Sequence, residues 1–433
     1  MKWLDATDPG FESTLDALLR AREDPATDAA LDERVRQILG AVRIQGDAAL
    51  LSLTRELDRW DAARAEDLEV SAAERSRALD GVGTAVAADL RLAAERIRVF
   101  HARQREESWA FETEEGIRLA QRTVPLRAVG VYVPGGTAAY PSSVLMNVVP
   151  AKVAGVETIV MVTPAPGGVV APAVLAAAEI AGVDRVFRIG GAQAVAALAF
   201  GTATVPRVDK IVGPGNAWVA AAKRQVFGTV AIDMIAGPSE VCVVATTDGG
   251  ASPADLAADL LSQAEHDPRA MVCLVTPERA LAEAVAAELD RQVERLPRRD
   301  IARAALDGYG VMVVTRDVAH ALAVAERIAP EHLELVIPDA LGAAENVRNA
   351  GAVFCGPHTP EAVGDYIAGP NHVLPTSGTA RFSSPLGVHD FTRRLNVLRF
   401  TRAGLAALGP ATIRLAEVEG LAGHAESVRR RLE

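Results

Sequence analysis

Ala128-Val-Gly-Val-Tyr-Val133 and Thr158-Ile-Val-Met-Val162 are short apolar runs with a helical segment between them. Runs of this length that end at Gly or Pro and alternate with helical segments indicate βαβ units around a buried parallel sheet. Arg185-Val-Phe-Arg-Ile189 and Lys210-Ile-Val212 continue the same pattern along the chain. These four runs therefore predict one α/β unit that begins near residue 127.

A second set of apolar runs follows the first at similar spacing, which predicts a second α/β unit of similar design. The fold class expected is α/β, with two Rossmann-like parallel-sheet domains, an N-terminal helical segment and a C-terminal helical tail. The runs of the second set are Glu240-Val-Cys-Val-Val244, Met271-Val-Cys-Leu-Val275, Gly310-Val-Met-Val-Val314, Glu334-Leu-Val-Ile337 and Ala352-Val-Phe354. The expected division is residues 1–30 as the helical segment, 131–238 as the first Rossmann-like domain, 31–130 with 239–378 as the second sheet domain, and 379–433 as the helical tail.

Composition and charge exclude several classes of protein. Apolar residues make up 49% of the chain and charged residues 23%, which is a globular balance. A formal net charge of −11 argues against binding to nucleic acid. The apolar stretches are interrupted before they reach the ~18–20 residues that a membrane helix needs. The three cysteines are widely spaced and form no CxxC pair, as expected of a cytoplasmic protein.

Three glycine-rich turns follow strands of the first set: Val133-Pro-Gly-Gly136, Ile189-Gly-Gly-Ala-Gln193 and Val212-Gly-Pro-Gly-Asn216. Such a turn before a helix presents backbone N–H groups to an anion, and Tyr132, Gln193 and Asn216 add hydrogen-bonding side chains nearby. The first unit is therefore the candidate nucleotide-binding unit. None of the turns matches GxGxxG or a P-loop, and each can also be explained as a tight βα turn.

Histidine is concentrated in the second half of the chain, where the candidate chemistry lies. Ser252-Pro253 starts a helix on which Gln263 and His266 share one edge, a spacing compatible with a metal or with a solvated polar face. Glu331 and His332 stand side by side at the start of a predicted strand. They are interpreted either as two proton-transfer groups in a cleft or as an ordinary surface pair.

Further polar residues stand in Gly/Pro-rich loops and in the tail. Asp365 and His372 lie in loops of this kind, where function concentrates, and the role of His372 is open. In the tail, Glu419 and His424 flank a helix break. Cys242 and Cys273 fall inside Val-rich runs and are interpreted as buried, whereas Cys355 beside a glycine leaves a nucleophilic role open.

Taken in order, these segments resemble the histidinol dehydrogenases, zinc- and NAD-dependent enzymes that perform the last two oxidations of histidine biosynthesis. The resemblance covers essentially the whole chain, and no functional position departs from the family's pattern. The segments that carry it are Tyr132-Val-Pro-Gly-Gly-Thr-Ala-Ala-Tyr-Pro-Ser-Ser, Ile235-Ala-Gly-Pro-Ser-Glu-Val, Leu261-Ser-Gln-Ala-Glu-His, Ala329-Pro-Glu-His-Leu, Gly364-Asp-Tyr, Gly369-Pro-Asn-His-Val-Leu-Pro-Thr and Glu419-Gly-Leu-Ala-Gly-His.

The resemblance implies a role for each candidate residue. One zinc ion per subunit would be held by Gln263, His266 and Asp365, together with His424 of the partner subunit in a homodimer that exchanges its tails. The same four residues would lie against L-histidinol, along with Ser239, His332 and Glu419 of the partner subunit. NAD would be bound by Tyr132, Gln193 and Asn216.

The resemblance also implies the reaction, a four-electron oxidation of L-histidinol to L-histidine through L-histidinaldehyde with two NAD. His332 would be the general base, and Glu331 would activate the water that adds to the aldehyde. One alternative is a related enzyme for another small alcohol, such as a sulfonated diol, although Glu419 would repel a sulfonate. A zinc hydrolase leaves the glycine-rich turns unexplained, and a non-catalytic binding protein leaves Glu331 and His332 without a role.

Overall fold

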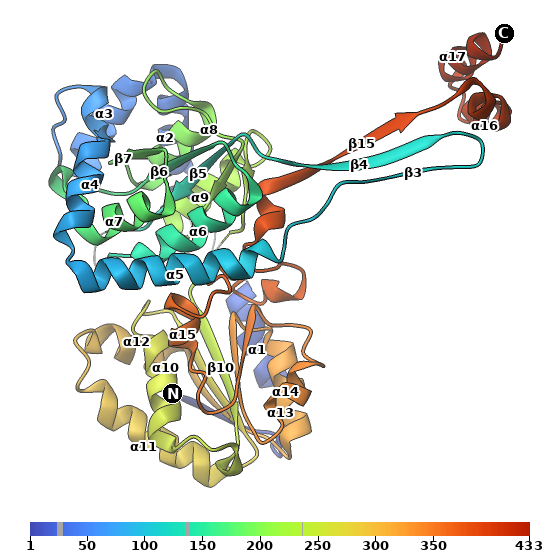
Figure 1. Cartoon of the computed structure of the whole chain (residues 1–433). Helices are drawn as coiled ribbons and strands as arrows, with labels where there is room; N and C mark the ends of the chain where they lie inside the picture. Colours follow the sequence, from blue (N-terminus) through green and yellow to red (C-terminus); the bar gives the residue numbers. More distant parts are fainter. Residues whose placement is uncertain (24–28, 136–138, 236) are drawn as a thin grey trace.

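The computed structural model describes residues 1–23, 29–135, 139–235 and 237–433. In Figure 1, two α/β units lie one above the other, and an extended arm projects away from them. Each unit contains a six-stranded sheet, and the arm contains a three-stranded sheet. The predicted fold class is confirmed, because both large sheets are mainly parallel and helices occupy both ends of the chain.

The first sheet has the strand order β2-β7-β6-β5-β8-β9, and all neighbours are parallel except β2 and β7. The connections run outward from β5 in both directions, so that a topological switch point lies between β5 and β8, where sheets of this type bind ligands. The strands are β2 (Glu69–Val70), β5 (Ala128–Tyr132), β6 (Thr158–Val162), β7 (Arg185–Phe187), β8 (Lys210–Val212) and β9 (Ala231–Ile232).

Four crossover helices connect these strands, as the sequence pattern predicts. They are α6 (Pro141–Ala154), α7 (Pro172–Ala181), α8 (Gly191–Phe200) and α9 (Ala217–Val226), with the 3-10 helix η2 (Pro166–Gly168) after β6. Proline in the first turn of α6 and α7 and a left-handed glycine after each set the bounds of these two helices.

The helices of the N-terminal part pack on this first unit. In the expected division, residues 31–130 belong with the second sheet, but α2 contacts α8 and α9, α4 contacts α7, and α5 contacts α6. Their apolar faces complete the cores on both sides of the first sheet, and an amphipathic stripe does not encode which sheet it will cover. The bounds are α2 (Ala29–Gln45), α3 (Asp47–Leu57), η1 (Ala65–Leu68), α4 (Ala72–Gly81) and α5 (Thr84–Ala102).

The second sheet is parallel throughout, with the order β1-β12-β11-β10-β13-β14. Counted from β10, the strands repeat the order of the first sheet counted from β5, so the similar design predicted for the two units is confirmed. The N-terminal segment, expected to be helical, also contributes the edge strand β1. The strands are β1 (Lys2–Asp5), β10 (Glu240–Ala245), β11 (Met271–Thr276), β12 (Gly310–Val314), β13 (His332–Val336) and β14 (Ala352–Cys355).

Helices cover both faces of the second sheet. One face packs against α10, α11 and α12, and the other against α1, α13 and α14. The bounds are α1 (Phe11–Glu23), η3 (Thr247–Gly249), α10 (Pro253–Ala264), α11 (Arg279–Val293), α12 (Arg299–Tyr309), α13 (Val318–Ile328), α14 (Ala340–Ala344), α15 (Glu361–Tyr366), η4 (Thr379–Arg381) and η5 (Val388–Phe391).

The arm consists of an antiparallel sheet and two terminal helices (Figure 1). Its elements are β3 (Trp109–Glu112), β4 (Arg118–Pro125), β15 (Thr392–Arg399), α16 (Arg402–Val418) and α17 (Ala422–Leu432). The predicted helical tail is present, whereas the strands that carry it outward were not predicted. Large apolar side chains on the arm are exposed, among them Leu398 (65%) and Val418 (85%). Within the described part of the chain, no helix has the length and apolar character needed to cross a membrane.

Candidate active site between the two sheets

A pocket lies where the carboxyl ends of the first sheet face the amino ends of the second. Pro134 follows β5 and Gly213 follows β8, so the first sheet contributes its switch point. Glu331, directly before β13, and Ser239, directly before β10, come from the second sheet. Gln263, His266, His332, Glu361, Asp365 and His372 also line this pocket.

The C-terminal end of α10 brings Gln263 and His266 to the pocket. Ser252 caps this helix by accepting the N–H of Asp255 at 3.2 Å, as its Ser-Pro start predicts. Gln263 is buried, and its side-chain amide donates to both carboxylate oxygens of Glu361, across 2.5 and 2.9 Å. This contact directs the amide oxygen of Gln263 away from the carboxylate.

Glu331 and His332 are both buried and are held by the backbone of one residue, Glu240. The N–H of Glu240 donates to Oε2 of Glu331 at 2.9 Å. The carbonyl of Glu240 lies 3.0 Å from Nδ1 of His332, and because a carbonyl only accepts, Nδ1 carries the hydrogen. The lone pair of the neutral ring is then on Nε2, which has no hydrogen-bond partner among the described residues.

The electrostatics of this pair follow from burial. Burial lowers the pKa of His332 to about 4, which keeps the imidazole neutral. Burial, followed by the charge of Glu240, raises the pKa of Glu331 well above its ordinary value. Once ionised, Glu331 is therefore a stronger base than an exposed carboxylate.

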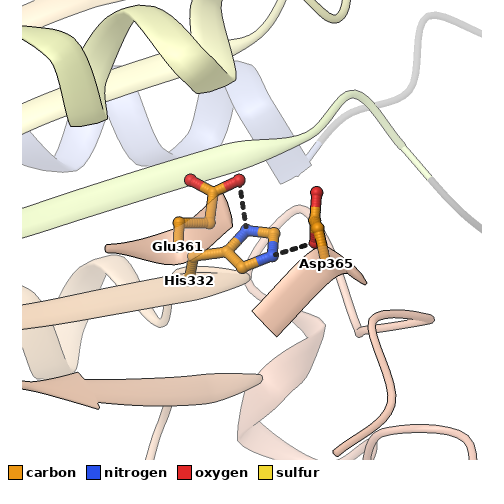
Figure 2. A group of neighbouring side chains, drawn as sticks. All are labelled: His332, Glu361 and Asp365. Carbon is orange, nitrogen blue, oxygen red and sulfur yellow. Dashed lines mark ion pairs between the residues drawn. The ribbon is translucent and has the colours of Figure 1, made fainter. Parts of the chain in front are cut away.

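His332, Glu361 and Asp365 form a compact cluster (Figure 2), in which one ligand atom from each lies within 4.8 Å of the others. Nε2 of His332 is 3.9 Å from Oδ1 of Asp365, and Nδ1 is 4.0 Å from Oε1 of Glu361. Glu361 was missed by sequence reasoning. The signal that points to it is its place four residues before Asp365 on the short helix α15, which sets both side chains on one face.

His372, whose role the sequence leaves open, lies against Asp365. Its Nδ1 is 3.0 Å from the backbone oxygen of Asp365 and 3.8 Å from Oδ1. Burial lowers the pKa of His372, so this second imidazole is also neutral at the edge of the cluster.

The two tail residues lie outside this pocket in their own chain. Glu419 follows α16 and His424 is on α17, both exposed at the end of the arm (Figure 1). A single chain therefore does not bring them to Gln263, His266 and Asp365.

The predicted nucleotide-binding residues lie at the carboxyl edge of the first sheet. The hydroxyl of Tyr132 accepts the N–H of Gly191 at 3.1 Å, and buried Gln193 follows in the first turn of α8, its Oε1 without a partner in the described chain. Asn216 caps α9 by accepting the N–H groups of Trp218 and Val219, at 3.1 and 3.2 Å. These three residues do not line the pocket described above.

The glycines of these turns are required by close packing. A Cβ on Gly213, which has φ +108°, would lie 2.1 Å from the carbonyl oxygen of Tyr132. A Cβ on Gly190 would lie 2.6 Å from Pro164. Gly136, part of the first predicted turn, is outside the described residues, as are Thr137, Ala138 and Ala236 of the quoted motifs.

Two doubly wound sheets with buried acid–base groups between them define an α/β enzyme. Comparison with known proteins assigns the family, because a family model described as histidinol dehydrogenase matches residues 21–432. The chain belongs to the histidinol dehydrogenase family and is thus an oxidoreductase.

Individual members of the family are similar to this chain over nearly their whole length. The histidinol dehydrogenase of Geobacter metallireducens is 51% identical over 433 residues, which are 100% of this chain and 98% of that protein. That of Syntrophotalea carbinolica is 52% identical over 100% of this chain and 99% of its own. A crystal structure of histidinol dehydrogenase from Elizabethkingia anophelis matches with a TM-score of 0.92 and 35% identity, covering 100% of this chain and 98% of that one.

Proposed function

We propose that this protein oxidises L-histidinol to L-histidine through L-histidinaldehyde, with zinc and two NAD, in the last steps of histidine biosynthesis. The observation that carries the proposal is a buried, neutral His332 beside the buried carboxylate of Glu331, with Nε2 of His332 unbonded by any described residue, in a chain of this family. A neutral imidazole and a carboxylate are the two bases that the two oxidations need.

Gln263, His266 and Asp365 are the proposed zinc ligands of this chain. Imidazole nitrogens and carboxylate oxygens are ordinary zinc ligands, and the amide oxygen of Gln263 is a less frequent one. The Gln263 amide nitrogen is engaged by Glu361, which leaves Oε1 as the ligand atom. A metal held by His332, Glu361 and Asp365 instead would consume the Nε2 that the base needs. Zinc, when bound, orients the amino alcohol through its nitrogen atoms.

The fourth ligand is proposed to be His424 of the partner subunit. In this chain His424 lies at the end of the arm, whose apolar side chains are exposed. A symmetric dimer that exchanges arms would cover these side chains and complete both pockets. Glu419 of the partner subunit would then reach the imidazole of the substrate, and Ser239 would bind its other end.

The first oxidation is proposed to use His332. Nε2 accepts the hydroxyl proton while the carbinol carbon gives up a hydride, so that the alcohol loses two electrons and two hydrogens. The Nδ1–H bond to Glu240 stabilises the imidazolium that forms, because a carbonyl oxygen favours the charged ring.

The second oxidation is proposed to use Glu331. This carboxylate takes a proton from a water molecule whose oxygen adds to the aldehyde carbon. The adduct is the alkoxide of the aldehyde hydrate, with the water proton kept on Glu331. It loses a hydride from carbon while its C–O⁻ bond becomes C=O, which gives the carboxylic acid. NAD, when bound, accepts one hydride in each oxidation.

NAD is proposed to lie at the carboxyl edge of the first sheet, on Tyr132, Gln193 and Asn216. The buried Oε1 of Gln193 supports this position, because it has no partner in the described part of the chain and a buried polar atom normally has one. A cytoplasmic location agrees with the free thiols of all three cysteines.

The test is NADH absorbance with L-histidinol and NAD, with and without a zinc chelator. We expect two NADH per histidinol, loss of turnover on chelation and recovery with zinc. Replacement His332→Asn should lower kcat by about 10²–10⁴-fold and leave zinc content and NAD binding unchanged. Zinc and NAD binding without turnover would instead indicate another small alcohol, and absence of NAD binding would overturn the proposal.

A further inference from the structure

Glu240 joins the two proposed catalytic residues, because its N–H holds Glu331 and its carbonyl holds His332, at 2.9 and 3.0 Å. Both contacts come from the backbone of a single residue, which is the first of β10. Any shift of this residue therefore moves the general base and the water-activating carboxylate together.

The side chain of Glu240 fixes the position of that backbone. Glu240 is only 3% exposed, and its carboxylate forms an ion pair with Arg22 at the end of α1. Oε1 also accepts the N–H of Ser377 at 3.0 Å, whereas Oε2 has no hydrogen-bond partner among the described residues. A buried carboxylate with so few hydrogen bonds depends on a neighbouring cation.

Arg22 is well placed to supply that cation. Its side chain is 11% exposed, and it approaches Glu240 from α1, a helix none of whose described side chains lines the pocket. On the other side, the N–H of Gly237 donates to Oγ1 of Thr376 at 2.7 Å, so the segment before β10 is also attached to the loop at 376–377.

We infer that Arg22 and Glu240 are a positioning pair for this reaction: the ion pair anchors Glu240, and its backbone sets Glu331 and His332 at their working geometry. The inference rests on the proposed function, since it assigns no reaction of its own. Neither Arg22 nor the Glu240 side chain is a catalytic residue, and both act through the two bases.

The experiment compares Arg22→Met, Arg22→Lys and Glu240→Gln with the wild-type enzyme. Glu240→Gln keeps the backbone contacts and removes only the charge. We expect Arg22→Met and Glu240→Gln to lower kcat by about tenfold or more, because small displacements of a catalytic group are costly. KM for histidinol, zinc content and the dissociation constant of NAD should change by less than about threefold. Arg22→Lys, which restores the cation, should recover most of kcat.

Arg327→Met is the matched control. Arg327 pairs with Glu12 and Asp16 and so ties α1 to α13, at 2.5 and 2.6 Å, without reaching Glu240. If the Arg22 pair only anchored α1, Arg22→Met and Arg327→Met would both lower the melting temperature and leave kcat within twofold of wild type, and this result would overturn the inference.

Two further comparisons keep the test decisive. Should Arg22→Met not fold, Arg22→Lys and Glu240→Gln carry the same comparison. In the double variant Arg22→Met/Glu240→Gln, kcat should fall no further than in the more impaired of the two single variants, because both changes remove the same interaction. An inactive wild-type enzyme would refute the proposed function and the inference together, whereas an active wild type with unaffected variants would refute the inference alone.

Discussion

The carboxylate of Glu334 accepts the backbone N–H of Glu361 across 2.7 Å, and this bond joins strand β13 to the first turn of α15. Both residues are buried, and Asp259 of α10 lies beside Glu334 as a second acid. Three elements that supply pocket residues thus meet behind the pocket at a group of acids.

This acid group makes stability depend on pH. Burial raises the pKa of Glu334 to about 8 and that of Asp259 to about 6, above the ordinary values near 4. A carboxyl with a raised pKa in the folded state stabilises the fold fully below its unfolded pKa. That contribution is lost as the pH rises through the folded value. Stability should therefore fall between about pH 4 and pH 8, the interval from the unfolded to the highest folded pKa.

Glu334→Gln should reduce this fall, because the amide oxygen still accepts the N–H of Glu361 and no second charge forms beside Asp259. At pH 9 the metal-free variant should have a melting temperature roughly 3–6 °C above that of the metal-free wild type, since about 1 kcal/mol corresponds to roughly 2–4 °C. Glu283→Gln, at an exposed position of α11, serves as the control. If the melting temperatures of wild type and Glu334→Gln fell equally with rising pH, the expectation would be contradicted.

Glu331→Gln should separate the two oxidations. The glutamine oxygen still accepts the N–H of Glu240, but the side chain no longer takes a proton from water. We expect histidinol to yield close to one NADH instead of two, with the aldehyde accumulating, and aldehyde oxidation to slow by about 10²–10⁴-fold. Single-turnover NADH formation with an aldehyde trap measures both quantities. Two NADH formed at the wild-type rate would rule out Glu331 as the activating base.

The buried strands were predictable because parallel strands covered on both faces consist of apolar runs, as in β5 and β10. The start of α10 was predictable from the Ser252 cap. The arm was not, since β15 is mostly exposed and carries no apolar run. A strand that is exposed on both faces gives only a weak signal in a single sequence.

The site was predictable only in part for a different reason. Gln263, His266, Glu331, His332 and Asp365 line one pocket, but their residue types alone also allowed a solvated edge and a surface pair, and only the family resemblance grouped them. Glu240 holds two of them through its backbone N–H and carbonyl, and such a role leaves no trace in the choice of side chain. Which sheet the N-terminal helices cover is likewise decided by tertiary packing and not by local sequence.

Cys242→Ala should leave turnover within about threefold of wild type. Cys242 is fully buried, lies opposite Cys273 in the paired strands, and does not line the pocket. The hydrogen bond with Cys273 and burial raise the pKa of this thiol, and a protonated thiol is a poor nucleophile. Cys355→Ala tests the half-buried cysteine in the same assay. A loss of several orders of magnitude in either variant would require a thiolate in the mechanism.

Mixing two inactive variants tests whether the arms are exchanged. His332→Asn removes a group from the pocket, and His424→Asn removes one from the arm, so each homodimer should be inactive. In a hybrid dimer with exchanged arms, one pocket has both an intact His332 and an intact His424 of the partner subunit. Subunits that are unfolded and refolded together in equal amounts should thus regain about a quarter of wild-type activity, because half of the dimers are hybrids with one working site. The control is a mixture of His332→Asn with Glu331→Ala, which should lack four-electron turnover at every mixing ratio because both changes lie in the same pocket. If His424 acted in its own chain, the His332/His424 mixture would stay inactive as well, and arm exchange would be refuted.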